Sequence, residues 1–209
     1  MIFVVSGPSG CGKSTLIRTV QHLLENLRFS ISHTTRKRRP SEKNGEDYHF
    51  VDRGRFERMV RRGEFAEWAR VHGQWYGTSW DELRKKGRRG RVVLDIDVQG
   101  ARQIRDRIPD VVMIFVSPPG YDELRRRLER RREDSPAAIE RRLRDAGEEI
   151  RAYPEFDFIV INDDLERAAE DLRSIIAASA CRTAEKKRRV GRILKSFSAA
   201  PKSRRRRKP

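Results

Sequence analysis

Short runs of apolar, mostly β-branched side chains recur along the chain at residues 2–5, 92–96, 111–116 and 156–161. Continuous apolar runs of this length are typical of parallel strands buried on both faces, because a strand with one wet face alternates apolar and polar positions. Amphipathic segments between the runs predict helices at residues 13–26, 98–107, 120–132, 136–152 and 165–178. The pattern predicts an α/β fold in which helices connect the strands of a parallel sheet.

The segment between the first predicted helix and the second apolar run has a different texture. Residues 30–51 and 65–78 are rich in aromatic and β-branched side chains, and Asn44-Gly45 and His72-Gly73 mark turns. We predict that this segment forms a small mixed lobe inserted into the α/β core.

Positive charge is concentrated at the C-terminal end of the chain. The 209 residues carry a net charge of +17 at pH 7, and residues 182–209 hold 13 lysines and arginines against one glutamate, so +12 of the charge lies there. The apolar periodicity fades from about residue 185, and we expect residues 182–209 to form a flexible basic tail. Two hypotheses for the tail stay open: contact with nucleic acid or another anionic surface, and no partner at all.

The remaining 181 residues are enough for one α/β domain with a substantial core. The apolar runs are much shorter than the roughly 18 residues of a membrane-spanning helix, and strand-like sequence starts at once. We therefore expect a cytoplasmic protein without membrane insertion. The two cysteines, Cys11 and Cys181, do not make a disulfide framework. The sequence makes no prediction about the oligomeric state.

A glycine-rich segment directly follows the first apolar run. Its residues match the pattern G-x-x-x-x-G-K-S, with Thr15 next: Gly7, Pro8, Ser9, Gly10, Cys11, Gly12, Lys13 and Ser14. Glycines let the backbone N–H groups wrap a phosphate at a distance that a Cβ would prevent. Lys13 can then reach the β- and γ-phosphates, and Ser14 can hold Mg²⁺. A turn that only links a strand to a helix leaves the Lys-Ser pair unexplained, so we predict an ATP-type site at residues 7–15.

Further motifs resemble those of guanylate kinases and occur in the same order. They are Ser32-His33-Thr34-Thr35-Arg36, Arg39-Pro40, NGEDYHF at 44–50, GEFAEW at 63–68, Tyr76-Gly77-Thr78-Ser79 and LDIDVQG at 94–100. Together with the glycine-rich loop, the resemblance covers about residues 1–180. It implies a P-loop kinase domain over residues 1–181, with a parallel five-stranded core sheet flanked by helices at 1–31 and 91–181. An inserted mixed α/β lobe at about 32–90 would bind a nucleoside monophosphate, and a helical lid would span about 125–145.

The resemblance also assigns residues to the acceptor nucleotide. Arginines and tyrosines hold its phosphate in guanylate kinases, and the matching positions are Arg36, Arg39, Tyr48 and Tyr76. Guanidinium groups bind phosphate oxygens in pairs, and phenolic hydroxyls orient the phosphate without adding charge.

Base recognition falls, by the same resemblance, to Ser32, Glu67, Thr78 and Asp97. Guanine presents two adjacent N–H donors that one carboxylate such as Glu67 accepts, whereas adenine presents an unprotonated nitrogen at that edge. We also expect Asp95 and Asp97 to point to opposite faces of a strand. Asp97 would then face the base, and Asp95 would order Tyr48 or a metal-bound water.

Phosphoryl transfer needs positive charge around the moving group rather than a covalent intermediate. The resemblance implies three lid arginines, Arg127, Arg131 and Arg142. Residues around Arg127 hold more arginines than is usual in the family, so we assign the catalytic role to Arg131 and Arg142. The catalytic set is then Lys13, Arg36, Arg131 and Arg142.

The resemblance completes the donor site by placing Asn162, after the last strand, against adenine. The leading hypothesis is an enzyme that phosphorylates GMP to GDP with ATP, with Mg²⁺ bound alongside ATP. Two alternatives are a guanylate-kinase-like binding module that has lost catalysis and a P-loop kinase for another phosphorylated acceptor. The intact P-loop and lid arginines argue against the first, and the pair of Glu67 and Ser32 argues against the second.

Overall fold

A parallel sheet of five short strands lies in the first of two compact units. The structure, a computed structural model, describes residues 1–130 and 135–198, and its units are Met1–Arg173 and Ser174–Pro209. Across the sheet the order is β2 (Leu27–Phe29), β7 (Arg91–Asp95), β1 (Ile2–Ser6), β8 (Val112–Ser117) and β9 (Phe158–Ile161), with all neighbours parallel. The predicted five-stranded parallel sheet is confirmed. The short strand β2 is the one that the hydrophobic pattern did not mark.

Five helices lie at the predicted places: α1 (Lys13–Leu23), α4 (Val98–Arg107), α5 (Tyr121–Arg130), α6 (Pro136–Ile150) and α7 (Leu165–Ser179), with a 3₁₀ turn at Tyr153–Glu155 before β9. The helix α3 (Trp80–Gly87), which precedes β7, was not predicted. The helix α1 ends three residues before the predicted end, because the chain is already extended at Leu24 and enters β2.

Both faces of the central strands are buried. On one face Val4, Leu94 and Met113 pack with Ala101 and Ile104 of α4 in one cluster. On β1 the flanking residues Phe3 and Val5 point to the other face and are equally buried. Burial on both faces explains why the runs that form β1, β7 and β8 are continuous. The run that forms the edge strand β9 is continuous too, although three of its four strand residues are exposed.

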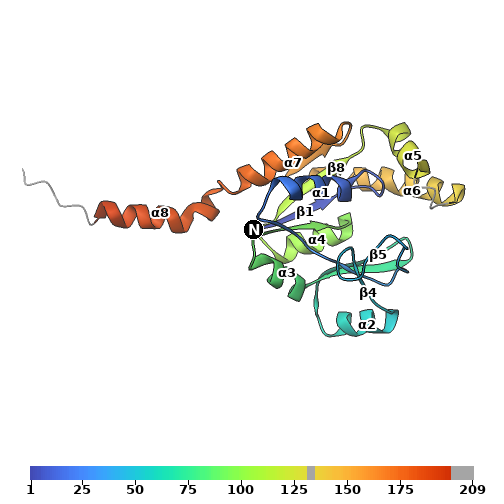
Figure 1. Cartoon of the computed structure of the whole chain (residues 1–209), viewed down its shortest axis with the longest axis horizontal. Coiled ribbons are helices and arrows are strands. Elements are labelled where there is room, and N and C mark those ends of the chain that lie inside the picture. Colours follow the sequence, from blue (N-terminus) through green and yellow to red (C-terminus); the bar gives the residue numbers. More distant parts are fainter. Residues whose placement is uncertain (131–134, 199–209) are drawn as a thin grey trace, which may run out of the picture. The chain divides into compact units, whose positions relative to one another are not determined.

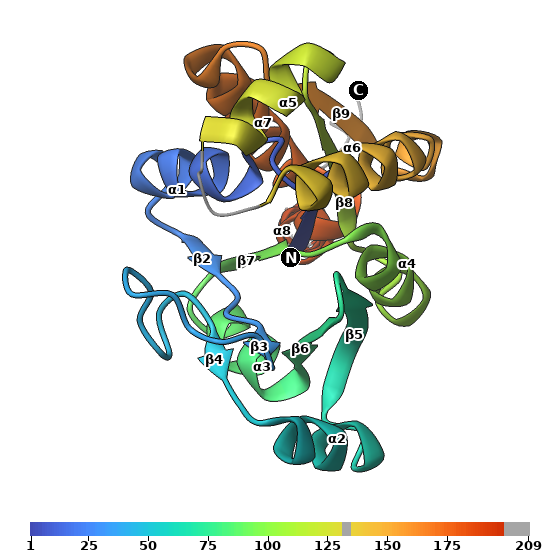
Figure 2. The ribbon, with the colours of Figure 1, turned by 90° about the vertical axis from the view of Figure 1, so that its right-hand side faces the viewer.

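The inserted lobe has its own sheet, in the order β4 (His49–Phe50), β3 (His33–Thr34), β6 (Gln74–Ser79) and β5 (Phe65–Val71). The pair β3 and β4 is parallel and the other pairs are antiparallel. Its helix α2 (Arg53–Arg61) packs Phe56 and Met59 against Phe65. Figures 1 and 2 show this sheet and α2 on one side of the parallel sheet. The prediction of a mixed inserted lobe is confirmed.

In the second unit, Thr183–Ser198 form the helix α8, within the segment predicted to be a flexible basic tail (Figure 1). The prediction missed it because charged residues outnumber apolar ones there, and a sparse apolar stripe is easily overlooked. The boundary between the compact units lies at Arg173, earlier than the predicted boundary at 181. Residues 199–209 of the predicted tail lie outside the described residues. Within the described part of the chain, no helix is long and apolar enough to cross a membrane.

Candidate active site

The glycine-rich loop links β1 to α1, and its shape depends on glycine. Gly7, Gly10 and Gly12 have φ angles of 137°, 94° and 97°. A Cβ on Gly7 would lie 2.0 Å from the carbonyl oxygen of Val116 in β8, so no other residue fits between the loop and the sheet. Gly12 caps α1 without a side chain, and the first N–H groups of the helix therefore remain available to an anion.

Lys13 and Ser14 lie at the start of α1 and contact the loop and the neighbouring strand. The Lys13 ammonium donates hydrogen bonds to the carbonyl oxygens of Gly7, at 2.6 Å, and Pro8, at 3.1 Å. Ser14 Oγ donates to Asp95 Oδ2 at 2.7 Å. A hydroxyl beside a carboxylate fits Mg²⁺, which takes oxygen ligands and is usually held by one or two carboxylates together with substrate phosphates.

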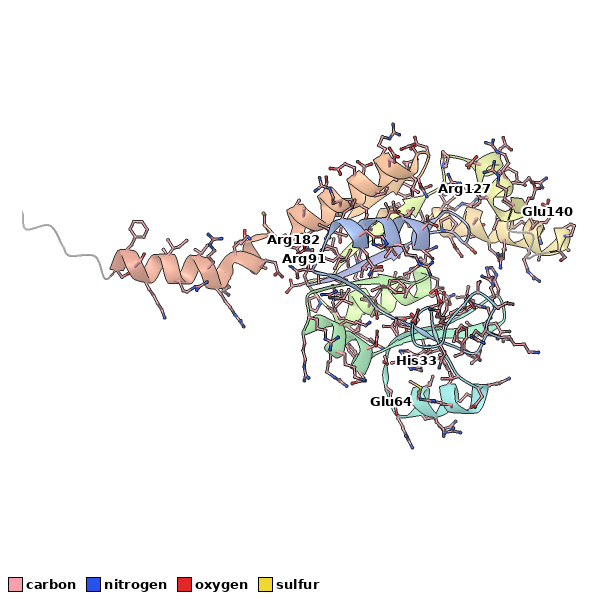
Figure 3. All side chains as sticks on the ribbon, viewed as in Figure 1. His33, Glu64, Arg91, Arg127, Glu140 and Arg182 are labelled. Carbon is pink, nitrogen blue, oxygen red and sulfur yellow. The ribbon has the colours of Figure 1, made fainter. Side chains whose placement is uncertain are left out.

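Two residues predicted for other roles hold the loop in place. Asn162 Nδ2 donates to the carbonyl oxygen of Cys11 at 2.7 Å, and Arg127 Nη1 donates to the same oxygen at 3.1 Å. Arg127 Nη2 also donates to the Asn162 carbonyl oxygen at 2.8 Å. Figure 3 labels Arg127 on α5. In this structure Arg127 braces the loop, and the Asn162 side chain is buried against it.

A cavity of about 1080 Å³ extends from the P-loop to the inserted lobe. It brings together most of the predicted site residues: Gly7, Ser9, Gly10, Gly12, Lys13, Ser14, Thr15, Ser32, Arg36, Arg39, Tyr48, Glu67, Tyr76, Asp97 and Arg142. Thr78 is fully buried next to the cavity wall, and its Oγ1 lies 3.1 Å from Ser32 Oγ. The loop and the lobe therefore face one shared space.

Glu67 is buried at the lobe end of this cavity. It is 2% exposed, and among the described residues its Oε1 has no hydrogen-bond partner. Burial raises the pKa of Glu67 to about 7, and the negative charge of Asp97 adds to the rise while a hydrogen bond from Thr78 opposes it. A buried carboxylate oxygen without a hydrogen-bond partner destabilises the protein. A ligand that supplies N–H donors to this oxygen removes the cost, so its binding is favoured.

The expectation that Asp95 and Asp97 point to opposite faces is wrong, since both line the cavity. Residues two apart in a strand share a face, and here β7 ends at Asp95. Asp97 is the N-cap of α4, and its Oδ1 accepts from the Gly100 N–H at 3.0 Å. A Cβ on Gly100 would lie 2.5 Å from Glu67 Oε2 and 3.2 Å from Asp97 Oδ1, so glycine lets the two carboxylates flank the same point of the wall.

Arg36 forms a bidentate ion pair with Glu42, a residue that the sequence analysis missed. Its two terminal nitrogens lie 2.6 and 3.1 Å from the Glu42 oxygens, and the Arg39 N–H donates to the same carboxylate at 2.8 Å. Partial burial opposes the Glu42 charge, but the bonds from Arg36 and Arg39 outweigh it and lower the Glu42 pKa. The Arg36 guanidinium also lies 5.4 Å from the ring centroid of Tyr48. A lone glutamate within a basic turn was the available signal.

The helix α6 contributes Arg142 and Glu149 to the cavity wall. Burial raises the pKa of Glu149 to about 7, although the nearby Lys13 charge lowers it in part. Glu149 was not predicted, because the pair Glu148-Glu149 resembles an exposed helix face. Arg131, predicted to act with Arg142, lies outside the described residues.

A phosphate-wrapping loop on a parallel sheet, joined by one cavity to an arginine-lined second site, defines a P-loop kinase. The family model described as guanylate kinase matches residues 1–179. The chain belongs to the guanylate kinase family and is an enzyme of the transferase class, as predicted.

Similar proteins cover nearly the whole chain. A guanylate kinase of Geobacter sulfurreducens is 48% identical over 185 residues, which are 88% of this chain and 91% of the relative. One from Legionella pneumophila (strain Lens) is 43% identical over 194 residues, 92% of this chain and 93% of the relative. A crystal structure of guanylate kinase from Anaplasma phagocytophilum aligns with a TM-score of 0.78 at 32% identity, over 97% of each chain.

Proposed function

We propose that this enzyme transfers the γ-phosphoryl group of ATP to GMP and forms ADP and GDP, as a step of purine nucleotide metabolism in the cytoplasm. The observation that carries the proposal is the buried Glu67 carboxylate, whose Oε1 has no partner among the described residues, at the far end of the cavity that the P-loop lines. The family supports a guanylate kinase, and Glu67 supports guanine as the base.

Glu67 favours guanine because one carboxylate accepts two adjacent N–H donors. Adenine would place an unprotonated nitrogen lone pair against the carboxylate, which leaves buried polar groups unpaired. Ser32 and Thr78, which hydrogen-bond to each other, and Asp97 complete the polar wall of this base pocket. A site built in this way rejects a base without the matching donors by about 10⁴-fold.

Arg36, Arg39, Tyr48 and Tyr76 would hold the GMP phosphate. For this, Arg36 exchanges the Glu42 carboxylate for phosphate oxygens, an exchange of one bidentate anion for another. The GMP phosphate oxygen is already negatively charged, so it attacks the γ-phosphorus of ATP in line without a general base.

At the ATP end, the loop N–H groups and Lys13 would hold the β- and γ-phosphates, and Asn162, while it holds the loop through Cys11, would lie beside adenine. Ser14 and Asp95 would hold Mg²⁺, which when bound neutralises charge on the phosphate oxygens. Arg142, together with Arg131, would place positive charge around the moving phosphoryl group. Closing the cavity around both nucleotides excludes water, so that ATP is not hydrolysed instead.

The test is a coupled assay of ADP formation with MgATP and each of GMP, AMP, CMP and UMP, run on the full chain and on Lys13→Ala and Glu67→Gln. Turnover confined to GMP and lost in Lys13→Ala supports the proposal. If a folded sample binds GMP but turns over no nucleotide, the proposal fails in favour of a binding module. Turnover of a different phosphorylated acceptor would identify another P-loop kinase.

A further inference from the structure

The helix α8 carries an apolar stripe that phosphoryl transfer does not use. Val190, Ile193, Leu194 and Phe197 recur at positions i, i+3, i+4 and i+7, which places them on one side of a helix. They are 45%, 47%, 61% and 76% exposed, and no residue of Thr183–Ser198 is buried. The residues that the guanylate kinase family model matches end at residue 179, so α8 lies outside the part of the chain that defines the kinase family.

The rest of α8 is strongly basic. Six lysines and arginines and a single glutamate lie within Thr183–Ser198, which gives the helix a net charge of +5: Lys186, Lys187, Arg188, Arg189, Arg192 and Lys195. Successive residues are about 100° apart around a helix. Arg188, Arg192 and Lys195 therefore lie on the side opposite the stripe. Lys187 and Arg189 lie at its flanks, and Lys186 lies in line with it, one turn before Val190.

We propose that α8 is an interfacial anchor that lies in the plane of an anionic phospholipid surface. A helix of this kind buries its apolar side at the boundary between headgroups and acyl chains, and its basic side contacts the headgroups. Each Lys or Arg near such a surface adds electrostatic attraction. The apolar stripe and the basic charge of α8 both have a role in this arrangement.

Two other partners fit the helix less well. A nucleic acid would satisfy the basic residues, but it would leave the continuous stripe from Val190 to Phe197 in water, and this helix offers Phe197 alone for base stacking. A second copy of α8 would cover the stripe, but it would bring two helices of net charge +5 together and create repulsion between like charges. An anionic lipid surface is complementary to both features. This inference does not depend on the proposed kinase reaction.

The experiment is co-sedimentation of the full chain with vesicles of phosphatidylcholine containing phosphatidylglycerol, and with vesicles of phosphatidylcholine alone. We expect binding to the anionic vesicles that weakens with added salt. The variant Leu194→Ser/Phe197→Ser should weaken this binding by about tenfold or more, because it removes the largest apolar groups. Arg188→Gln/Arg192→Gln should also weaken it, and the matched substitution Ala184→Ser, away from the stripe, should not.

Circular dichroism of each variant and thermal unfolding of the kinase unit check that the fold is retained. Equal binding of Leu194→Ser/Phe197→Ser and the unmodified chain would overturn the proposal, because charge alone would then explain adsorption. Binding to a nucleic acid duplex without binding to anionic vesicles would overturn it too. So would self-association, measured by light scattering, that disappears in the serine variant while the vesicles bind nothing.

Discussion

The proposed phosphate sites and the proposed base pocket of the cavity differ in how their polar groups are satisfied. At the phosphate sites, charged and polar groups have partners within the protein: Lys13 binds two loop carbonyls, Ser14 binds Asp95, and Arg36 binds Glu42. In the base pocket Glu67 Oε1 is buried and, among the described residues, has no hydrogen-bond partner. On the proposed function, the groups at the phosphate sites would exchange these partners for a bound nucleotide, whereas Glu67 in the base pocket would gain a partner.

This difference separates affinity from selectivity. An exchange of one ion pair for another gives a modest net gain, because both states satisfy the same charges. A buried carboxylate that gains its missing donors gives a larger gain, and only a base with matching N–H groups supplies them. Substitutions at the phosphate sites should therefore affect all nucleotides alike, and substitutions in the base pocket should act on GMP.

The largest effect is expected for Lys13→Ala. Removal of the ammonium that faces the β- and γ-phosphates should lower kcat by about 10³-fold, because stabilisation of developing charge is the main contribution to phosphoryl transfer. The measurement is steady-state ADP formation with MgATP and GMP. Lys43→Ala, at an exposed lysine whose ammonium lies 3.4 Å from Glu46 Oε2, is the control and should leave kcat unchanged.

Glu67→Gln should lower kcat/KM for GMP by about a hundredfold, mainly through KM, because the amide replaces one acceptor with a donor facing guanine. The KM for ATP should stay the same. Thermal unfolding at pH 8 should show no loss of stability, because the substitution removes a buried charge. An equal rise in the KM values for GMP and ATP would contradict the separation between the two parts of the cavity.

Binding of GMP should weaken below pH 7. Burial raises the Glu67 pKa from its usual 4.5 to about 7, and the protonated carboxyl no longer accepts both donors, so the affinity should fall by about tenfold per pH unit below that value. Calorimetric titration of GMP across this range measures the effect. In Glu67→Gln this part of the pH dependence should vanish, and the part due to Glu149, whose pKa is also about 7, should remain.

The stability of the protein should change with pH in the opposite sense. The folded pKa of Glu67 lies above its unfolded value, so between pH 4.5 and 7 the native state holds a proton that the unfolded chain has released. Its contribution to the free energy of unfolding therefore decreases as the pH rises through this window. Glu149 adds a contribution of the same sign. Urea unfolding of the unmodified chain and Glu67→Gln at several pH values measures the difference.

The smallest effect is expected for Gly100→Ala. The new Cβ would lie 2.5 Å from Glu67 Oε2 and should displace the carboxylate, which raises the KM for GMP by about fivefold, equivalent to roughly 1 kcal/mol of overpacking. Gly147→Ala is the matched control, because it adds a methyl group to a helix with no described atom within 4 Å. A change in GMP affinity in both variants would indicate an effect of helix propensity rather than of the pocket.

Much of the fold could be predicted from the sequence, because its signals are local. Continuous apolar runs marked β1, β7, β8 and β9, and the glycine spacing marked the loop. The turn at His72-Gly73 is confirmed by positive φ angles at both residues, 47° and 83°. The strand β2 was missed because three residues give no period, and α8 was missed because its stripe is sparse within basic sequence.

The sequence predicted cavity residues whose type itself indicates a chemical role, and Lys13, Arg36 and Glu67 do line one cavity. It was not predictable where the role depends on a distant partner. Glu42 matters because it lies against Arg36, and Arg127 matters because it reaches the carbonyl oxygen of Cys11. No spacing rule links Arg127 to a loop 116 positions earlier in the chain.

The two bonds on the Cys11 carbonyl oxygen also set an order of events during synthesis. They come from residues 116 and 151 positions further along the chain, whereas the inserted lobe is built from residues close to one another in the sequence. A ribosome makes about 5–20 residues per second, so the lobe leaves it seconds before Asn162 does. The loop that is translated first therefore reaches its final shape among the last parts of the kinase unit, and a nascent chain cannot hold ATP in its finished site until translation has passed Asn162.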